Sequence, residues 1–329
     1  MNQRPYPLLS LSFIRAYGIT MRPYLLFISA AAGMAGFASG PVRGPAVTLG
    51  AFFVFFSAYG FSQGLTDSFQ MDTDAISSPY RPMIQGLITP AQVLPVSLAG
   101  LAAGCMILLI LNPQTLPLGV LSVFGLATYT FFKRRWWGGP FYNAWIVALL
   151  PVIGRMAALG PGHSPSDALQ DGMPAPLLAG IFFAYANFVL AGYTKDISAD
   201  RQTGYRTFAV VFGWTATAVV SDFFAGLSVL ATGRAVIPLI IGGSFTISKG
   251  GALFFFVAAA VVLAAGQVQL HRIRDEKLAY RPIANVVRGF LLLQLAVISS
   301  LRGAWFPAAV IFYLLFEGVL SRRPAKDQV

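Results

Sequence analysis

Residues 176–201 read PLLAGIFFAYANFVLAGYTKDISADR, an apolar run of eighteen residues (176–193) that leads into a short charged segment. A run of this length crosses a bilayer as an α-helix, because a hydrocarbon core of about 30 Å needs about 20 residues. The charged segment, Lys195-Asp196-Ile197-Ser198-Ala199-Asp200-Arg201, places two carboxylates four positions apart, on one face of a continued helix. The stretch therefore predicts a membrane helix that ends in an acidic face.

The composition of the whole chain agrees with a membrane protein. Of its 329 residues 56% are hydrophobic and 11% charged, whereas a soluble domain carries about 25% charged residues. The apolar runs are continuous rather than alternating, which favours helices over a barrel. They cover residues 23–40, 46–64, 93–112, 115–132, 142–160, 176–193, 208–232, 250–270, 284–301 and 303–320. Little more than Arg302 separates the last two, so we predict an all-α, polytopic membrane protein with nine or ten spans, in one domain over residues 1–329.

The net charge of +11 has a topological interpretation, because the basic residues fall between the apolar runs. Most lie in alternate loops, and all of these lie on one side if the N-terminus is cytoplasmic: Arg15, Arg22, Arg81, Lys133, Arg134, Arg135, Lys195, Arg201, Arg206, His271, Arg272 and Arg274. The opposite loops hold only Arg43, Arg234 and Lys249. The positive-inside rule then predicts an integral protein of the cytoplasmic membrane, in contact with anionic lipids and not with nucleic acid.

A second acidic stretch, Thr66-Asp67-Ser68-Phe69-Gln70-Met71-Asp72-Thr73-Asp74, follows the second apolar run. Together the two stretches hold five of the twelve acidic residues, and the orientation places both in the cytoplasm. On a helix Asp67, Gln70 and Asp74 share one face, while Asp72 points elsewhere. Two facing acidic surfaces at the mouth of a bundle suit Mg²⁺, which keeps some waters and takes further oxygens from phosphate.

These residues predict a magnesium–diphosphate site. The metal ligands would be Asp67, Asp74, Asp196 and Asp200. Seven basic residues near the two stretches would bind the remaining phosphate oxygens: Arg22, Arg81, Lys133, Arg134, Lys195, Arg201 and Arg206. The simpler interpretation, that interfacial Asp and Arg cap helix ends and pair with one another, stays open for each residue taken alone.

The segment 74–86, DAISSPYRPMIQG, resembles the first loop of the UbiA-type intramembrane prenyltransferases, in which an Asn-x-x-x-Asp-x-x-x-Asp motif leads into Arg-Pro and Gly. Residues 195–207, KDISADRQTGYRT, resemble the second Asp-x-x-x-Asp loop of the family. Arg22-Pro23 and Lys133-Arg134 also stand where the family carries basic residues. The resemblance covers nearly the whole chain in order and spacing.

The resemblance implies a fold and an activity. It implies nine transmembrane helices around a central cavity, and Mg²⁺-dependent transfer of a prenyl group from a prenyl diphosphate to an aromatic or other lipophilic acceptor. The motif positions that it implies for catalysis are Gln70, Asp74, Asp196 and Asp200, and we add Asp67, which shares the face of Gln70 and Asp74. The metal would act as a Lewis acid on the leaving diphosphate.

The first motif departs from the family pattern, because Thr66 and Gln70 stand where the family has Asn and Asp. Asp67 lies on the same face and could replace the missing carboxylate. Three interpretations remain: an enzyme with shifted ligands, which we favour, an enzyme with altered chemistry such as terpene cyclisation, or a member with little metal-dependent activity. A terpene cyclase would need no acceptor.

A membrane transporter is the non-enzymatic alternative. Transporters place ionisable residues near the bilayer midplane. Only Asp222 and Glu317 interrupt the apolar spans in this way, and the sequence shows no obvious partner for either.

Overall fold

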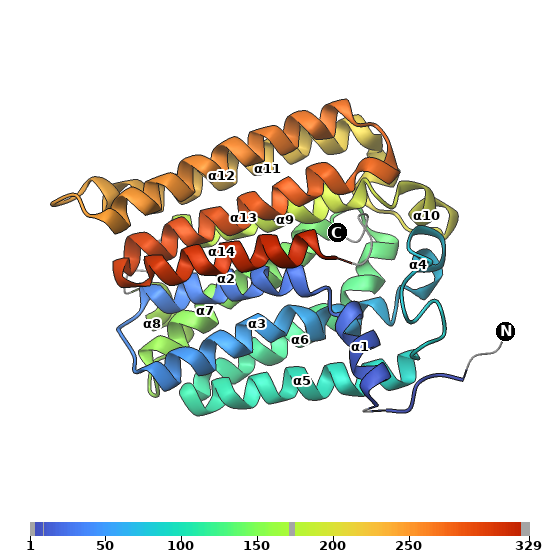
Figure 1. The fold of residues 1–329 in the computed structure, drawn as a ribbon, viewed down its shortest axis with the longest axis horizontal. Coiled ribbons are helices and arrows are strands. Elements are labelled where there is room, and N and C mark those ends of the chain that lie inside the picture. The colour runs from blue at the N-terminus through green and yellow to red at the C-terminus, as the bar shows by residue number, and fades with distance from the viewer. Residues whose placement is uncertain (1–3, 9, 171–174, 324–329) are drawn as a thin grey trace.

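The computed structural model describes residues 4–8, 10–170 and 175–323, and none of these residues forms a strand. The long helices lie side by side in one bundle (Figure 1). The α-helices are α1 (Leu11–Thr20), α2 (Leu26–Ser39), α3 (Pro45–Asp67), α4 (Met71–Ser77), α5 (Pro90–Leu111), α6 (Leu116–Arg135), α7 (Gly139–Leu159), α8 (Pro165–Gln170), α9 (Ala175–Tyr193), α10 (Ile197–Gln202), α11 (Phe208–Ile241), α12 (Ile247–Arg272), α13 (Tyr280–Leu301) and α14 (Phe306–Ser321).

All ten predicted apolar runs are helical. Nine helices among the described residues are long and apolar enough to cross a membrane, and the tenth, Pro23–Ser39, is shorter. The C-terminal stretch forms two helices, because the chain leaves α13 at Arg302 and passes through the 3₁₀ turn Gly303–Trp305 before α14 begins. The all-α membrane fold is therefore confirmed.

The predicted end of the seventh run was wrong. We expected a loop around Arg234, but α11 continues through this residue to Ile241. Arg234 is exposed on the helix surface, so its charged group can extend outward while the backbone stays helical. The apolar sequence resumes directly after it.

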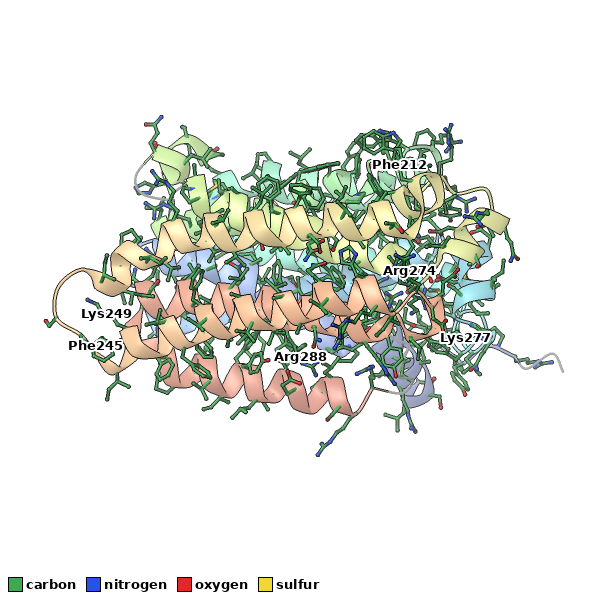
Figure 2. The ribbon with its side chains drawn as sticks, turned by 90° about the horizontal axis from the view of Figure 1, so that it is seen from above. Phe212, Phe245, Lys249, Arg274, Lys277 and Arg288 are labelled. Atoms are coloured by element: carbon green, nitrogen blue, oxygen red, sulfur yellow. The ribbon has the colours of Figure 1, made fainter. Side chains whose placement is uncertain are left out.

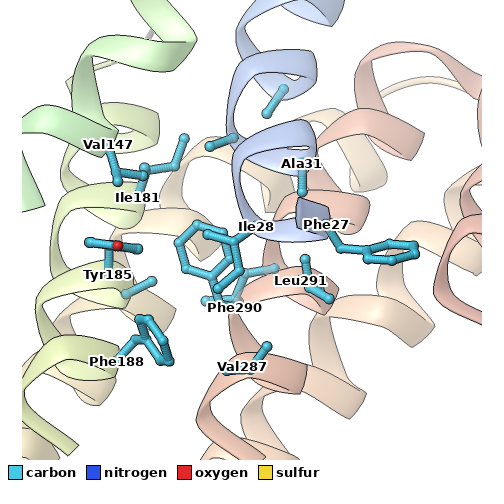
Figure 3. Close-up of a cluster of buried hydrophobic side chains, with 14 of the residues drawn as sticks. Phe27, Ile28, Ala31, Val147, Ile181, Tyr185, Phe188, Val287, Phe290 and Leu291 are labelled. Atoms are coloured by element: carbon cyan, nitrogen blue, oxygen red, sulfur yellow. The ribbon is translucent and has the colours of Figure 1, made fainter. Parts of the chain in front are cut away.

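The core lies around α13, the most enclosed long helix, whose apolar window is 83% buried, while that of α14 is 17% buried. Phe290 of α13 lies near Ile28 of α2, and its ring contacts that of Tyr185 of α9, with centroids 6.2 Å apart (Figure 3). The outer helices expose large apolar side chains such as Phe53 and Leu314. An apolar exterior of this kind is expected where lipid replaces water.

Helices α2 and α7 approach each other closely through small residues. A Cβ atom on Gly36 would overlap the carbonyl oxygen of Pro151, and one on Gly154 would overlap that of Gly33. Close contact of backbones through glycine is a common way for membrane helices to associate.

We expect Gly36→Leu to destabilise the fold by about 1–3 kcal/mol, because neither backbone can retreat from the inserted side chain. Thermal unfolding in detergent measures the loss. Gly50→Leu in α3 is the matched control, since nothing lies within 4 Å of a Cβ at that position. Equal melting temperatures for the two variants would contradict the proposed packing.

The two acidic stretches meet at one end of the bundle. The short helices α4 and α10 lie against each other there, although about 120 residues separate them in the sequence (Figure 1). Viewed from above, Arg274 and Lys277 lie toward the same end, and Phe245 and Lys249 lie at the opposite end (Figure 2). The fold thus concentrates the predicted site residues at one end of the membrane helices.

Candidate active site

A cavity of about 220 Å³ is lined by residues of α3, α5, α6, α7 and α9, and also by Asp74 of α4 and by Asp196, the N-cap of α10. Seven of the predicted site residues line it: Arg22, Asp67, Gln70, Asp74, Arg81, Lys133 and Asp196. Its remaining wall is largely apolar and includes Val54, Leu101, Leu108 and Ile153. The cavity therefore joins a charged end to an apolar pocket.

The first acidic stretch forms a buried cluster with two arginines. One Arg22 nitrogen donates to both carboxylate oxygens of Asp67, at 3.1 Å each. Arg81 pairs with Asp74 and lies 3.7 Å from Asp67. Gln63, one turn earlier on α3, also donates to Asp67. Asp67 is only 2% exposed, so its oxygens are largely committed to these partners.

Arg22 reaches this cluster through an unusual backbone conformation. Its φ is +51°, and it is the one non-glycine residue with a positive φ in the described part of the chain. The following Pro23 disfavours the right-handed helical region for the preceding residue, and a left-handed non-glycine residue costs of order 1–3 kcal/mol. The charge-assisted hydrogen bond from one Arg22 nitrogen to both oxygens of Asp67 is an interaction that offsets part of this cost.

Gln70 joins the two acidic stretches without a charge of its own. Its carbonyl oxygen accepts a hydrogen bond from Lys133 Nζ at 3.0 Å, and its amide donates to Thr130 at 3.3 Å. The same lysine lies 3.4 Å from Asp200 Oδ1. Lys133, near the end of α6, therefore connects the glutamine of the first stretch to a carboxylate of the second.

The second acidic stretch leaves carboxylate oxygens unused. Asp196 lines the cavity, and its buried Oδ1 has no hydrogen-bond partner. Asp200 is fully buried and does not line the cavity; its Oδ1 accepts from Thr73 at 3.1 Å, and its Oδ2 is also without a partner. Buried oxygens of this kind normally find a donor or a cation.

Burial also shifts the titration of the carboxylates outside the membrane-spanning helices. It raises the pKa of Asp74 to about 6, against the opposing effect of Arg81. It raises the pKa of Asp200 as well, against the opposing effect of Lys133. A divalent cation would favour the charged form of both groups. The donor set therefore fits Mg²⁺.

The ligands do not form a closed protein cage. Within the described ranges no three His, Cys, Asp or Glu side chains are grouped closely enough to hold a metal ion together. Magnesium commonly takes one or two carboxylates and completes its shell with water and phosphate oxygens. The observed spacing suits that mode of binding.

Four predicted diphosphate ligands do not line the cavity: Arg134, Lys195, Arg201 and Arg206. Arg134 pairs with Asp72 at 2.8 Å and lies over the ring of Tyr205 at 4.5 Å. Lys195 is buried, while Arg201 and Arg206 are exposed. For Arg134 the simple pairing of interfacial charges describes the observed contact.

The sequence analysis missed several polar residues of the site. Gln63, Thr73 and Thr130 bind the motif side chains directly, and Tyr59 and Tyr185 line the cavity. Gln63 had a usable signal, because it lies four residues before Asp67 on the same helical face. Thr73 and Thr130 had none, since their partners come from distant segments.

Asp222 and Glu317, for which the sequence shows no obvious partner, are both paired in the structure. Asp222 lies 2.7 Å from His271 of α12, and Glu317 lies 2.7 Å from Arg288 of α13. Figure 2 shows Arg288 midway along the bundle, away from the two acidic stretches. Both carboxylates therefore belong to interhelical pairs outside the cavity.

This architecture defines a polytopic membrane protein with a cluster of charged residues in the lining of an internal cavity. The model of the UbiA prenyltransferase family matches residues 26–286. The chain belongs to this family, and the predictions of the family and of a prenyltransferase enzyme are confirmed.

Curated relatives carry prenyltransferase names. The digeranylgeranylglyceryl phosphate synthase of Pyrococcus furiosus is 26% identical over 257 residues, which cover 75% of this chain and 81% of the relative. The 4-hydroxybenzoate octaprenyltransferase of Ralstonia nicotianae is 29% identical over 200 residues, which cover 59% of this chain and 61% of the relative.

Solved structures share the fold. A UbiA homologue from Aeropyrum pernix has a TM-score of 0.64 at 18% identity and covers 87% of this chain and 96% of its own. A UbiA homologue from Archaeoglobus fulgidus, bound to GPP and Mg²⁺, has a TM-score of 0.59 at 16% identity and covers 86% of this chain and 99% of its own.

Proposed function

We propose that this protein transfers a prenyl group from a prenyl diphosphate to a lipophilic acceptor inside the membrane, and that it depends on Mg²⁺. The observation that carries the proposal is the cavity itself, whose lining combines carboxylates and cations with a largely apolar wall. The names of the curated relatives and the homologue bound to GPP and Mg²⁺ support the same chemistry.

Asp196 and Asp200 are the foremost candidates for metal ligands, since each keeps an unpaired oxygen. Asp74 and Asp67 would complete the metal site from the opposite side. When bound, Mg²⁺ would neutralise the diphosphate and make it a better leaving group. Arg22, Arg81 and Lys133 line the cavity and would bind phosphate oxygens, while Arg134, Lys195, Arg201 and Arg206 would attract the anion from outside.

The rest of the cavity suits the prenyl chain. Its apolar wall would bind the isoprenoid tail and keep water away from a cationic intermediate. Tyr129 and Tyr193 line the cavity near the diphosphate end, and their hydroxyls are hydrogen bonded at 2.9 Å. Aromatic faces there would stabilise an allylic cation.

The charge distribution supports a cytoplasmic position for the site. The site end carries most of the basic residues between helices, and the opposite end carries few. A cysteine introduced at the exposed Ser198 should react with an impermeant reagent only when the cytoplasmic face is accessible. Labelling of this variant from outside intact cells would show that the site faces away from the cytoplasm.

One assay tests the function. The full chain in proteoliposomes is incubated with Mg²⁺ and prenyl diphosphates of several lengths, with and without phenolic acceptors, and the products are identified. We expect pyrophosphate release that depends on an acceptor. A cyclic hydrocarbon or alcohol formed without acceptor would indicate a terpene cyclase. Absence of turnover under every condition would refute both enzymatic proposals.

We expect Gln70→Asp to tighten Mg²⁺ binding by about tenfold, because it adds a carboxylate where the sequence pattern of the family has one. Lys133, which already contacts this side chain, can compensate the new charge. The measurement is the Mg²⁺ concentration that gives half-maximal pyrophosphate release. The control is Gln70→Glu, which is isosteric with glutamine. Its side chain is longer than that of aspartate, so its carboxylate lies at a different position. If Gln70→Asp needs as much Mg²⁺ as the unaltered protein, or more, for half-maximal release, the side chain at position 70 lies outside the metal site.

A further inference from the structure

The short helix α10, which carries the second acidic stretch, is capped by a residue from a distant loop. Glu276 belongs to the 3₁₀ turn Glu276–Leu278 between α12 and α13, at the end of the bundle where Figure 2 shows Lys277. Its Oε2 accepts from the amide of Ser198 at 3.0 Å, and its Oε1 accepts from the hydroxyl of the same serine at 2.6 Å. The two residues are 78 positions apart, so the tertiary fold makes this contact.

Ser198 holds a position that helices often cap from their own chain. Asp196 is the N-cap of α10, and its carbonyl oxygen accepts from the amide of Asp200 at 2.8 Å. An aspartate at the N-cap commonly turns its carboxylate back onto the amide of the second or third helical residue, and Ser198 is the second. The Asp196 side chain makes no such bond within α10, all of whose residues are described. Glu276 occupies the amide that this carboxylate would otherwise bind.

The carboxylate of Asp196 is thereby left to the cavity. Asp196 lines the cavity, and its buried Oδ1 meets no donor among the described residues. A carboxylate oxygen of this kind is available to a cation. Two places therefore compete for one side chain, the amide of Ser198 and the cavity. Glu276 satisfies the amide, and this frees Asp196 for the cavity.

Helix α10 is held from its other side through Asp200. This carboxylate accepts from Thr73 of α4 at 3.1 Å and lies 3.4 Å from Lys133 Nζ of α6. Glu276 contributes a second anchor, which comes from the turn between α12 and α13. The contact with Glu276 therefore joins the second acidic stretch to the C-terminal part of the bundle.

We propose that Glu276 is a positioning residue of the metal site: by capping α10 from outside, it keeps the carboxylate of Asp196 in the cavity, where it can bind Mg²⁺. The inference rests on the proposed function, in particular on Asp196 as a metal ligand. Without Glu276, the freed amide of Ser198 would draw the Asp196 carboxylate into an N-cap bond. The helix would stay capped, and the metal would have to compete for its ligand.

Binding of Mn²⁺, a paramagnetic substitute for Mg²⁺, tests the inference without turnover. The full chain in phosphatidylcholine nanodiscs is titrated with Mn²⁺, and free Mn²⁺ is measured by electron paramagnetic resonance. We expect Glu276→Ala to weaken Mn²⁺ binding by about threefold to tenfold, because one ligand of several must leave an N-cap bond first. The melting temperature should stay within about 2 °C, since Asp196 takes over the cap.

Two outcomes of this titration would overturn the inference. One is an unchanged Mn²⁺ affinity in Glu276→Ala. The other is a melting temperature that falls by roughly 10 °C together with the affinity, which would identify Glu276 as a residue that stabilises the fold as a whole.

Two further variants separate positioning from the charge of Glu276. Glu276→Gln removes the same charge but keeps a carbonyl oxygen for the amide of Ser198, so it should retain most of the Mn²⁺ affinity. Asp275→Asn is the matched control, because Asp275 accepts from the amide of Lys277 within its own turn, and it should leave the affinity unchanged. If Glu276→Gln binds Mn²⁺ as weakly as Glu276→Ala, or if Asp275→Asn weakens binding equally, the effect is one of charge and the positioning role is wrong.

Turnover separates this inference from the proposed function. In proteoliposomes, Glu276→Ala should need several times more Mg²⁺ for half-maximal pyrophosphate release, while kcat at saturating Mg²⁺ stays within about twofold. A normal Mg²⁺ requirement in an active Glu276→Ala protein would overturn the positioning role and leave the transferase function intact. If the unaltered protein binds Mn²⁺ but releases no pyrophosphate with any acceptor, the transferase function is refuted, and the Mn²⁺ titrations decide the positioning role.

Discussion

Asp196→Asn should lower kcat/KM for the prenyl diphosphate by about a hundredfold to a thousandfold while the protein stays folded. Asp196 lines the cavity with an oxygen that no protein donor satisfies, so the substitution removes charge from the metal site without breaking an internal bond. Pyrophosphate release in proteoliposomes measures activity, and thermal unfolding measures stability.

Two variants sharpen this prediction. Asp200→Asn should lose activity and also melt at a lower temperature, because Asp200 accepts from Thr73 and compensates the buried Lys133. Asp72→Asn should keep nearly normal activity, since Asp72 does not line the cavity and its partners are the half-exposed Arg134 and the hydroxyl of Tyr205. If Asp196→Asn retains activity within tenfold of the unaltered protein, Asp196 is not a metal ligand.

The role of Asp67 changes when its contacts are considered. The sequence offered it as a substitute ligand for the carboxylate missing at position 70. Its oxygens accept from Arg22 and Gln63 and lie close to Arg81, so it also holds the two arginines that would bind phosphate. Loss of diphosphate affinity and loss of Mg²⁺ affinity in Asp67→Asn would distinguish these two contributions.

Most of the fold was accessible from the sequence, because membrane helices satisfy their own backbone and leave a continuous apolar run. The uncertain points were local. Arg302 alone could not show whether two runs form one bent helix or two, since the break depends on the backbone turn at Gly303–Trp305. The predicted end of α11 was wrong because a membrane helix tolerates a surface arginine such as Arg234 where its side chain can extend outward.

The candidate site was predictable only in its residue types. Spacing placed Asp196 and Asp200 on one face of a continued helix, but α9 ends at Tyr193 and Asp196 is the N-cap of the separate helix α10, which lies beside α4. Spacing does not show which cation meets which carboxylate. Arg22 and Asp67 are 45 residues apart, and Lys133 and Gln70 are 63 apart, so these pairs depend on how four helices pack. The partners of Asp222 and Glu317 were missed for the same reason.

Arg81→Met should destabilise the protein by about 3–5 kcal/mol, which is a large effect for one substitution. The Arg81 side chain is 11% exposed and lies between Asp74, which it pairs with, and Asp67 at 3.7 Å. Methionine nearly preserves the apolar part of the side chain but leaves two carboxylates facing each other in a buried site. The unfolding temperature should fall by roughly 10 °C, measured in detergent without metal.

The double variant Arg81→Met/Asp74→Asn identifies the cause of that loss. If the loss comes from the uncompensated carboxylate, neutralising Asp74 should restore more than half of the stability, although activity stays low because a phosphate-binding cation is still missing. Arg134→Met controls for the loss of an arginine as such, and it should change stability by less than about 0.5 kcal/mol, since that side chain is 37% exposed. A double variant as unstable as Arg81→Met would show that Arg81 stabilises the fold by packing rather than by its charge. The cluster of Arg22, Asp67, Asp74 and Arg81 would then be a structural element of the bundle first and a phosphate site second.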